Sequence, residues 1–370
     1  MLYYMREVFM IRQKRGVFSV FPLIALSVWL TAYALLMTQR AMETVRTALG
    51  VFVFSVLPPL AIFSVCAKML VKTNAALKYV FGRLAPFLDV VGMSVGGFTA
   101  FLFGLFAGFP TGAAILAELL EKDEISEQEA ESLLPFCNQA SVAFLFGTVG
   151  AMLNDPGAGF VFFCAQTVTA WICVCLTAGG RRDGRAYRPS GKRPAVSLAS
   201  ALTEAVRESA FSMIGVCGFV VFFSLLGTAL ADTLSACGLP FGPLFYAVAG
   251  GGLEISFGFR LLAEGSFSKE ILWICGGAFL GFGGISVFMQ ATERTEAFFF
   301  SPVKYFGGKI PSCMLCAVFS LLFGLLCERN DGKKLMIALS FMIFCVFYLL
   351  NYVKIKFFSK KCGKIKRNAV

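Results

Sequence analysis

The 370-residue sequence contains no histidine. This absence excludes His-based catalytic triads, HExxH zinc sites and imidazole proton relays. Charged residues are also scarce, at 15% of the chain, whereas hydrophobic residues make up 58% and the mean hydropathy is +0.77. An ordinary soluble domain carries about 25% charged residues. The composition therefore indicates a polytopic membrane protein, with the lipid bilayer as its main surroundings.

Motifs for common enzyme chemistry are absent as well. The 13 cysteines are scattered singly through apolar runs, so we interpret them as small buried hydrophobes. Cys313 and Cys316 have CxxC spacing, but they lie in a predicted span, which favours helix packing over redox work. GGKIPS at 307–312 lacks the phosphate-loop spacing and is predicted to be an interfacial turn with Lys309 at the headgroups. We expect no enzyme activity, no metal site and no cofactor, although the acidic run at 121–131 is suited to weak binding of a divalent cation.

The formal net charge of +11 comes from three short segments at the predicted membrane edge, which are residues 1–16, 179–194 and the tail after 353. Such clusters are topology signals, so we expect no nucleic-acid partner. The positive-inside rule places all three segments in the cytoplasm. The protein is therefore predicted to lie in a cell membrane with both termini cytoplasmic.

Apolar windows of membrane length predict about eight transmembrane helices. They lie at 17–37, 45–66, 138–153, 159–178, 211–231, 270–290, 306–327 and 335–353. Pro58 and Pro59 predict a kink in the second span, and residues 67–86 form an amphipathic stretch suited to the interface. A charged helix is expected at 121–131 and a polar helix at 197–209. Two glycine-rich stretches, 90–120 with a turn near Pro110 and 240–265, are predicted to be re-entrant helical hairpins. The fold class is therefore an all-α polytopic membrane protein.

Counting the crossings indicates that the two halves are inverted relative to each other. With the N-terminus inside, the span at 45–66 runs outward to inward and its counterpart at 211–231 runs inward to outward. GAAILAE at 112–118 and GFRLLAE at 258–264 repeat a short pattern at matching places. We divide the chain into five parts. These are a first segment (1–44), a first repeat (45–178), a basic linker with an amphipathic helix (179–210), a second, inverted repeat (211–327), and a last helix with a basic tail (328–370).

Residues beside the helix breaks are the candidate site. Inverted repeats of discontinuous helices form the central binding sites of many secondary transporters, where half-helix N-termini face anions and unwound carbonyls face cations. The candidate substrate-binding residues are Thr111, Asn138, Gln139, Ser141, Glu254, Ser256, Ser286 and Gln290. The candidate helix-break residues are Gly108, Pro110, Gly112, Gly251, Gly252, Gly258, Gly283 and Gly284. Glu254 is the sharpest candidate, because a carboxylate in an apolar context costs several kcal/mol unless it is paired or coordinated.

Each of these residues also has a purely structural interpretation. Glu254 could pair with Arg260, or lie near the surface if the hairpin is shallow. Thr111, Ser256 and Ser286 could bond a carbonyl one turn back or let helices pack closely. Asn138 and Gln139 could simply cap a helix, and we expect the carboxylates Glu118 and Glu264 at the hairpin edges to be solvated.

The stretch GFPTGAAILAELLEKDEISEQEAESLLPFCNQ resembles the signature of the sporulation integral membrane protein YlbJ family, in the nucleoside-recognition or Gate domain group. The matching residues are Phe109, Pro110, Gly112, Phe136, Cys137 and Asn138. GGLEISFG and GFGGISVFMQ also resemble the second half of that family, so the likeness covers about residues 45–327. It implies a multi-pass protein of the bacterial cell membrane in endospore formers, made in the mother cell and linked to spore cortex formation. The Gate group is similar to concentrative nucleoside transporters, but GFPTGAA stands here in place of their QTEAP-like string.

Two functions remain open from the sequence. The first is a transporter or permease for a small polar solute, nucleoside-like by resemblance, with Na+ or H+ as a coupling cation. The second is a structural or assembly protein of the developing spore envelope that keeps a transporter-like fold without transport. A homo-oligomer is compatible with both.

Overall fold

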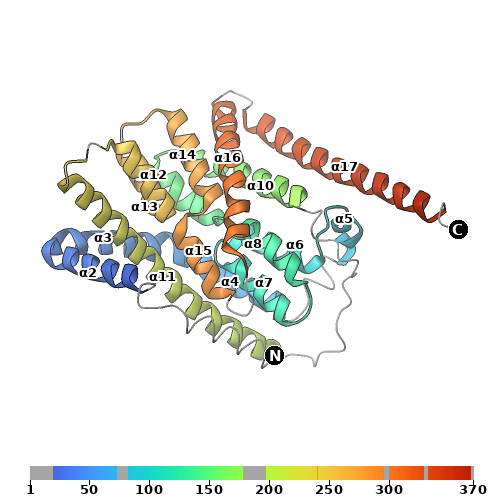
Figure 1. The fold of residues 1–370 in the computed structure, drawn as a ribbon, viewed down its shortest axis with the longest axis horizontal. Helices are drawn as coiled ribbons and strands as arrows, with labels where there is room; N and C mark the ends of the chain where they lie inside the picture. Colours follow the sequence, from blue (N-terminus) through green and yellow to red (C-terminus); the bar gives the residue numbers. More distant parts are fainter. Residues whose placement is uncertain are drawn as a thin grey trace.

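The protein is described by a computed structural model, which covers residues 20–72, 82–177, 197–239, 241–295, 300–328 and 332–367, with only the backbone of Pro59 and of 353–367. The described residues form helices and contain no strand. The predicted basic segments at 1–16 and 179–194 lie outside this part of the chain, as do residues 73–81 of the predicted interfacial stretch. Figure 1 shows the helices packed as one bundle, with the last helix extending away from it toward the C-terminus.

Five helices in the described part are long and apolar enough to cross a membrane. They are Ala158–Thr177 (α10), Leu198–Ala236 (α11), Lys269–Arg294 (α14 and α15), Pro302–Cys327 (α16) and Gly332–Tyr352, which is the first part of Gly332–Arg367 (α17). Two further pairs of helices qualify only if each sharply bent pair is counted as one span. The all-α membrane fold is therefore confirmed.

The first bent pair is Phe21–Leu36 (α2) and Thr38–Val51 (α3), which meet at 103°. Helix α3 runs through a π-helical turn at Phe52–Val56 into Leu57–Lys72 (α4). That turn directly precedes Pro58 and Pro59, whose missing N–H groups deprive carbonyls one turn back of their usual donors. The distortion predicted at the two prolines is thus a local widening of the helix.

The hairpin predicted over 90–120 is present. Its arms are Val95–Ala107 (α6) and Thr111–Glu121 (α7), which pack against each other and are joined by a turn at 108–110 that contains a cis peptide bond before Pro110. Helix α6 follows Ala85–Val90 (α5) in the chain. The two helices meet at a sharp bend and form the second bent pair.

Two predicted boundaries in the middle of the chain are wrong. Residues 138–153 do not form a span, because 138–141 are not helical and only a short helix follows, made of the π-turn Phe144–Val149 and Gly150–Met152 (α9). The charged helix begins later than expected and continues into the interior as Glu127–Cys137 (α8). Together these pieces form one discontinuous helix, 127–152. The polar helix at 197–209 and the span at 211–231 are likewise a single helix, α11.

The second half repeats the order of elements of the first. The hairpin Pro243–Leu253 (α12) and Ile255–Glu264 (α13) is followed by the discontinuous helix Lys269–Phe282 (α14) and Gly284–Arg294 (α15), and then by α16. The matching series in the first half is α6 and α7, then 127–152, then α10. Helices α10 and α16 pack against each other, and each also packs against the discontinuous helix of the other half. The inverted relation of the halves stays a prediction that this order supports.

Helix α11 carries ion pairs near both of its ends. Near its start, Glu208 pairs with Lys68 at 3.3 Å and with Lys72 at 2.9 Å, and near its end Asp232 pairs with Arg40 at 3.6 Å. At 1.5 Å of rise per residue, the two groups lie roughly 36 Å apart along the helix. A hydrocarbon core is about 30 Å thick, so the two groups fit its opposite edges.

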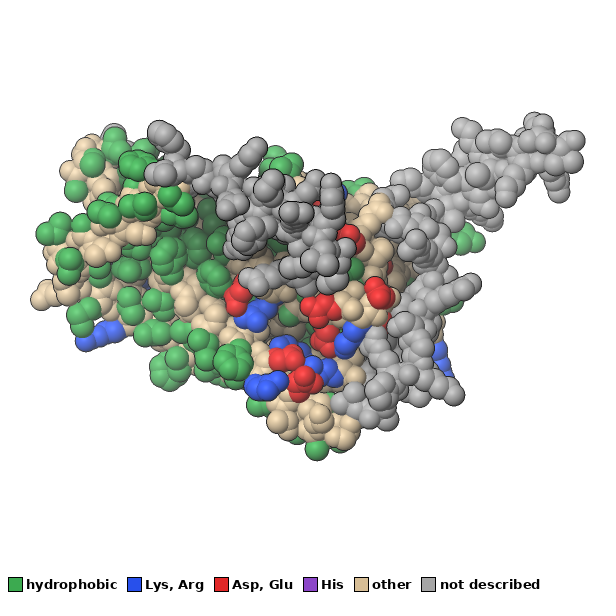
Figure 2. All heavy atoms as spheres, turned by 60° about the horizontal axis from the view of Figure 1, so that its bottom comes forward, with side chains coloured by type: hydrophobic (Ala, Val, Ile, Leu, Met, Phe, Trp, Pro, Cys, Tyr) green, Lys and Arg blue, Asp and Glu red, His purple; other side chains and the backbone are tan. Residues whose placement is uncertain are grey.

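Helix α16 shows the same arrangement. Lys304 in its first turn pairs with Glu131 of α8, and Glu328 just beyond its end pairs with Lys269 at 3.2 Å. Figure 2 views the face on which α11 begins and shows acidic and basic side chains gathered together there. These pairs agree with the predicted crossings, because each pair joins two helix ends that the predictions place on the same side of the membrane.

Candidate functional site

The first break, at 138–141, has its carbonyl groups bonded by protein donors. Lys309 Nζ donates to the Asn138 carbonyl at 3.2 Å, the Phe109 N–H donates to Gln139 at 2.9 Å, and Gln166 Nε2 donates to Ala140 at 2.8 Å. The donors come from α16, the first hairpin and α10. Because unbonded carbonyls are costly in hydrocarbon, these three elements allow the helix to be interrupted here.

Glycines let the first hairpin approach this break closely. A Cβ atom at Gly104 or at Gly112 would lie within 2 Å of the Cys137 carbonyl oxygen, so both arms of the hairpin pack directly on the end of α8. Gly108 ends α6 with a φ of +84° and lies against Ser141. The chain breaks at 108–110, as predicted. Gly112 is helical, so the prediction that it breaks the helix is wrong, and its missing side chain instead lets α7 pack closely on the end of α8. The packing of the first hairpin on the end of α8 therefore accounts for the presence of both GFPTG, at 108–112, and FCNQ, at 136–139, in the sequence.

The second hairpin breaks at Glu254, which leaves the helical conformation between α12 and α13. Its carboxylate accepts the Phe257 N–H at 2.7 Å and the Ser256 hydroxyl at 3.1 Å, and its residue exposure is 3%. Arg260 lies over the Phe257 ring and forms no ion pair with Glu254 in the described structure. The carboxylate thus caps the positive end of α13, which offsets part of the cost of burying it.

The glycines of the second half have two different roles. Gly251, Gly252 and Gly258 are helical, so the prediction that they break the helix is wrong, and Gly258 packs on the backbone of Gly251. Gly283 and Gly284 do form a break, with φ values of +90° and +77° that favour glycine. Gly284 lies close to the Leu253 carbonyl, so the second break contacts the second hairpin as the first break contacts the first.

Residues of both hairpins line one cavity of about 20 Å³. Its polar lining comes from Ser141 of the first break and from Glu254 and Ser256 of the second hairpin, and Gly108 and Phe109 complete it from the first hairpin. Apolar side chains of the α3–α4 helix and of α11 also line it. Three of the predicted substrate-binding residues therefore meet in one place, although Ser141 lies more than a hundred residues before Glu254 and Ser256 in the sequence.

The other predicted binding residues are buried elsewhere. Thr111 begins α7, and Gln139 donates from Nε2 to the Phe136 carbonyl at 3.0 Å, which is a local capping contact. Gln290 donates to the Ser286 hydroxyl at 3.1 Å within α15. Asn138 is 1% exposed, and its side-chain amide lies near the Tyr305 hydroxyl.

The sequence analysis missed Lys309, Tyr305 and Gln166. Lys309 is fully buried inside α16, so its predicted place at the headgroups is wrong. Tyr305, one turn earlier, is 1% exposed, and its ring lies 5.8 Å from Lys309 Nζ. The sequence does contain a signal for Lys309 and Gln166, because each is a polar side chain within an apolar run, and such a side chain needs a partner inside the membrane.

A second polar region lies between α3 and α11, next to the cavity. A smaller space of about 10 Å³ is lined by Thr44, Ser224 and Arg260 among others, and it shares Val220 and Ser256 with the first cavity. Thr44 contacts Thr228 across the helix pair at 3.4 Å.

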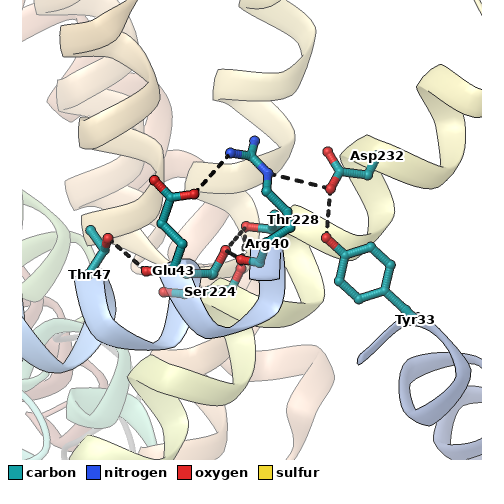
Figure 3. Close-up of polar contacts among 8 residues, drawn as sticks. Tyr33, Arg40, Glu43, Thr47, Ser224, Thr228 and Asp232 are labelled. Atoms are coloured by element: carbon teal, nitrogen blue, oxygen red, sulfur yellow. Dashed lines mark hydrogen bonds and ion pairs between the residues drawn. The ribbon is translucent and has the colours of Figure 1, made fainter. Parts of the chain in front are cut away.

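Beyond these hydroxyls, at the same end of α11, lies the cluster shown in Figure 3. There Asp232 accepts a hydrogen bond from Tyr33 at 2.6 Å and pairs with Arg40. Polar side chains thus lead from the cavity toward this end of the bundle, where the ionic cluster joins α2, α3 and α11.

These features define an integral membrane protein whose broken helices and helical hairpins enclose a small, partly polar cavity. Among curated proteins, the chain is similar to the sporulation integral membrane protein YlbJ of Bacillus subtilis (strain 168), with 26% identity over 296 residues. The match covers 71% of this chain and 72% of that protein. No family model matches the sequence, and no solved structure matches it.

Proposed function

We propose that this protein is a secondary transporter or permease for a small polar solute, in which Glu254 carries a coupling proton. The observation that supports the proposal is the convergence of Ser141, Glu254 and Ser256, from two separate helix breaks, on one cavity. A buried carboxylate without an ion-pair partner can be neutralised by a proton, and intramembrane carboxylates of this kind serve as proton relays in transporters.

The cavity volume indicates which state of the transport cycle the structure represents. A space of about 20 Å³ holds about one water molecule, far less than a nucleoside. One ionic cluster joins α3 to α11 through Arg40 and Asp232, and another joins α4 to α11 through Lys72 and Glu208. We interpret the structure as an occluded state in which both ends are closed, and solute entry requires one cluster to open.

The solute class and the biological setting come from similarity. The named relative supports a sporulation-associated membrane protein, and the resemblance to the Gate group supports a nucleoside-like solute and a part in spore cortex formation. The geometry of the cavity by itself supports a small polar solute, and neither of these two more specific proposals rests on it.

A non-transporting structural or assembly protein of the spore envelope is the second candidate. It is favoured by the first break, whose carbonyls at Asn138, Gln139 and Ala140 already have protein donors. One lone pair of each of these carbonyl oxygens is thus already used by a protein donor, as a purely structural break requires.

Uptake by the reconstituted full-length protein decides between the two. We expect Glu254→Gln to abolish solute uptake driven by a pH gradient, and Asn138→Ala to reduce it. Glu264→Gln is the matched control, because Glu264 lies at the exposed end of the same hairpin. If both site variants transport every nucleoside and small polar solute tested as the unmodified protein does, the site assignment fails. If they also support sporulation while substitutions in 121–131 abolish it, the structural role is correct.

A further inference from the structure

Lys309 lies where two of the broken helices end. Its Nζ donates to the carbonyl of Asn138, the residue that caps the C-terminus of α8. The same Nζ lies 3.4 Å from the position that a Cβ atom would take on Gly283, the residue that caps the C-terminus of α14. The carbonyl end of a helix carries a partial negative charge, so the ammonium group lies between two ends that attract a cation.

No acidic side chain of the described structure pairs with Lys309. Its residue exposure is 0%, and one hydrogen bond is formed by an ammonium group that has three donors. The side chains around it are the Tyr305 ring and the thiols of Cys137, Cys173, Cys313 and Cys316. Helix ends and neutral groups, rather than a carboxylate, therefore surround this amino group.

Backbone carbonyls and helix C-terminal ends, which surround Lys309 Nζ here, are also the groups that bind a coupling metal ion in transporters. Na+ sites at unwound helices are formed by backbone carbonyls and half-helix C-termini, and they require no carboxylate. Here the position beside the unwound segment 138–141 is already filled by a basic side chain of the protein itself. The Asn138 amide and the Tyr305 hydroxyl, which lie close to each other, are the neutral polar side-chain groups of the residues beside it.

We propose that the Lys309 ammonium group is the resident cation of a site formed by the C-terminal ends of α8 and α14, and that it occupies this site in place of a bound metal ion. If the transport function proposed above is correct, coupling by a metal ion at the first break is excluded. That result agrees with a proton at Glu254 as the coupling ion. The cation site itself does not depend on transport.

Removing the side chain empties the site and makes it open to an added cation. We expect Lys309→Ala, purified at full length in detergent, to show a saturable rise in Tm of about 3 °C or more with ethylammonium chloride or NaCl, relative to choline chloride at equal ionic strength. The unmodified protein and Lys309→Met, which fills the space with a neutral chain, are expected to show no such rise. A response in Lys309→Ala equal to that of the unmodified protein overturns the proposal.

A second measurement covers the case in which Lys309→Ala does not fold. An amine-acylating reagent followed by peptide mass spectrometry compares Lys309 with Lys304 on the same helix of the unmodified protein, where the Lys304 side chain is 69% exposed. We expect acylation of Lys309 to be at least about 100-fold slower than that of Lys304, because the ammonium group is enclosed. Equal rates overturn the proposal. Neither measurement involves transport, so a failed uptake assay leaves this result standing.

Discussion

Gly104 of α6 faces the Cys137 carbonyl so closely that a Cβ atom at Gly104 would lie 1.8 Å from the carbonyl oxygen. The neighbour is backbone rather than the flexible end of a side chain, so it cannot rotate away. We expect Gly104→Ala to push α6 off the end of α8 and to lower the free energy of unfolding by several kcal/mol, with strong loss of folded protein. The measurement is the yield and Tm of the purified variant in detergent.

Gly218→Ala is the matched control. Gly218 is also inside a helix, α11, but a Cβ atom there meets nothing within 4 Å. The same substitution should therefore leave Tm unchanged or raise it, because alanine stabilises a helix interior by up to about 1 kcal/mol relative to glycine. Equal Tm values for the two variants would show that the contact between Gly104 and Cys137 is not tight in solution.

This contact also shows what sequence reasoning can predict here. The break at Gly108 and Pro110 and an interruption within 240–265 follow from the sequence, because glycine or proline inside an apolar run is a local signal, but the exact place of the second interruption, at Glu254 rather than at its neighbouring glycines, does not. Local signals are also sufficient to predict the hairpins on either side of each break. The conclusion that the two breaks line one cavity requires the tertiary packing of the two halves.

Lys309 shows why the rest of the site was not predicted. It lies near the start of an apolar run, where a lysine usually extends to the headgroups. Helix α16 instead begins at Pro302, so Lys309 lies about two turns inside it, and its Nζ lies at the ends of α8 and α14. Burial of this kind depends on which helices are neighbours. For the same reason the span predicted at 138–153 was wrong, since the donors that permit the break come from Lys309 and Gln166 on other helices.

Glu131 of α8 lies outside the membrane-spanning segments, and we expect it to make the stability of the fold depend on pH. Burial raises the pKa of its carboxyl group, but hydrogen bonds from Lys304 and from the Ser301 N–H outweigh this effect, and the pKa is lowered below its ordinary value. A carboxyl group whose pKa is lower in the folded state stabilises the fold above its unfolded pKa, near 4.5, and this stabilisation is lost as pH falls through the folded pKa. The expected loss between pH 6 and pH 3 is about 1 kcal/mol or less, because Lys304 is largely exposed.

The measurement is Tm against pH for the unmodified protein and for Glu131→Gln. The variant should be less stable at pH 6 and should show a smaller further loss by pH 3, so that the two curves converge at low pH. Glu127→Gln, at the exposed start of the same helix, is the control for removing one negative charge. Parallel curves for Glu131→Gln and the unmodified protein would mean that the contact with Lys304 does not form in solution.

Asp232 is the residue through which the cluster in Figure 3 joins α11 to the first two helices. If the structure is an occluded state, replacing this carboxylate weakens the contacts with Tyr33 and Arg40 together and lets that end of the bundle open more often. Asp232→Asn keeps the size of the side chain and removes its charge. The lost contacts amount to about 1 kcal/mol, because the Arg40 side chain is 57% exposed and solvent screens the pair. The open population should therefore rise about three- to tenfold.

A cysteine at Val220 reports this opening, because Val220 is 3% exposed and lines both cavities. In liposomes, Val220→Cys should react with a membrane-impermeant maleimide about three- to tenfold faster when combined with Asp232→Asn. Peptide mass spectrometry reads this position separately from the native cysteines. Asp155→Asn is the control, because that carboxylate only accepts a hydrogen bond from Gly157 in the turn before α10. Equal labelling rates in both backgrounds would show that the Asp232 cluster does not keep this end closed, and access to Glu254 would then have to come from the end held by Lys72 and Glu208.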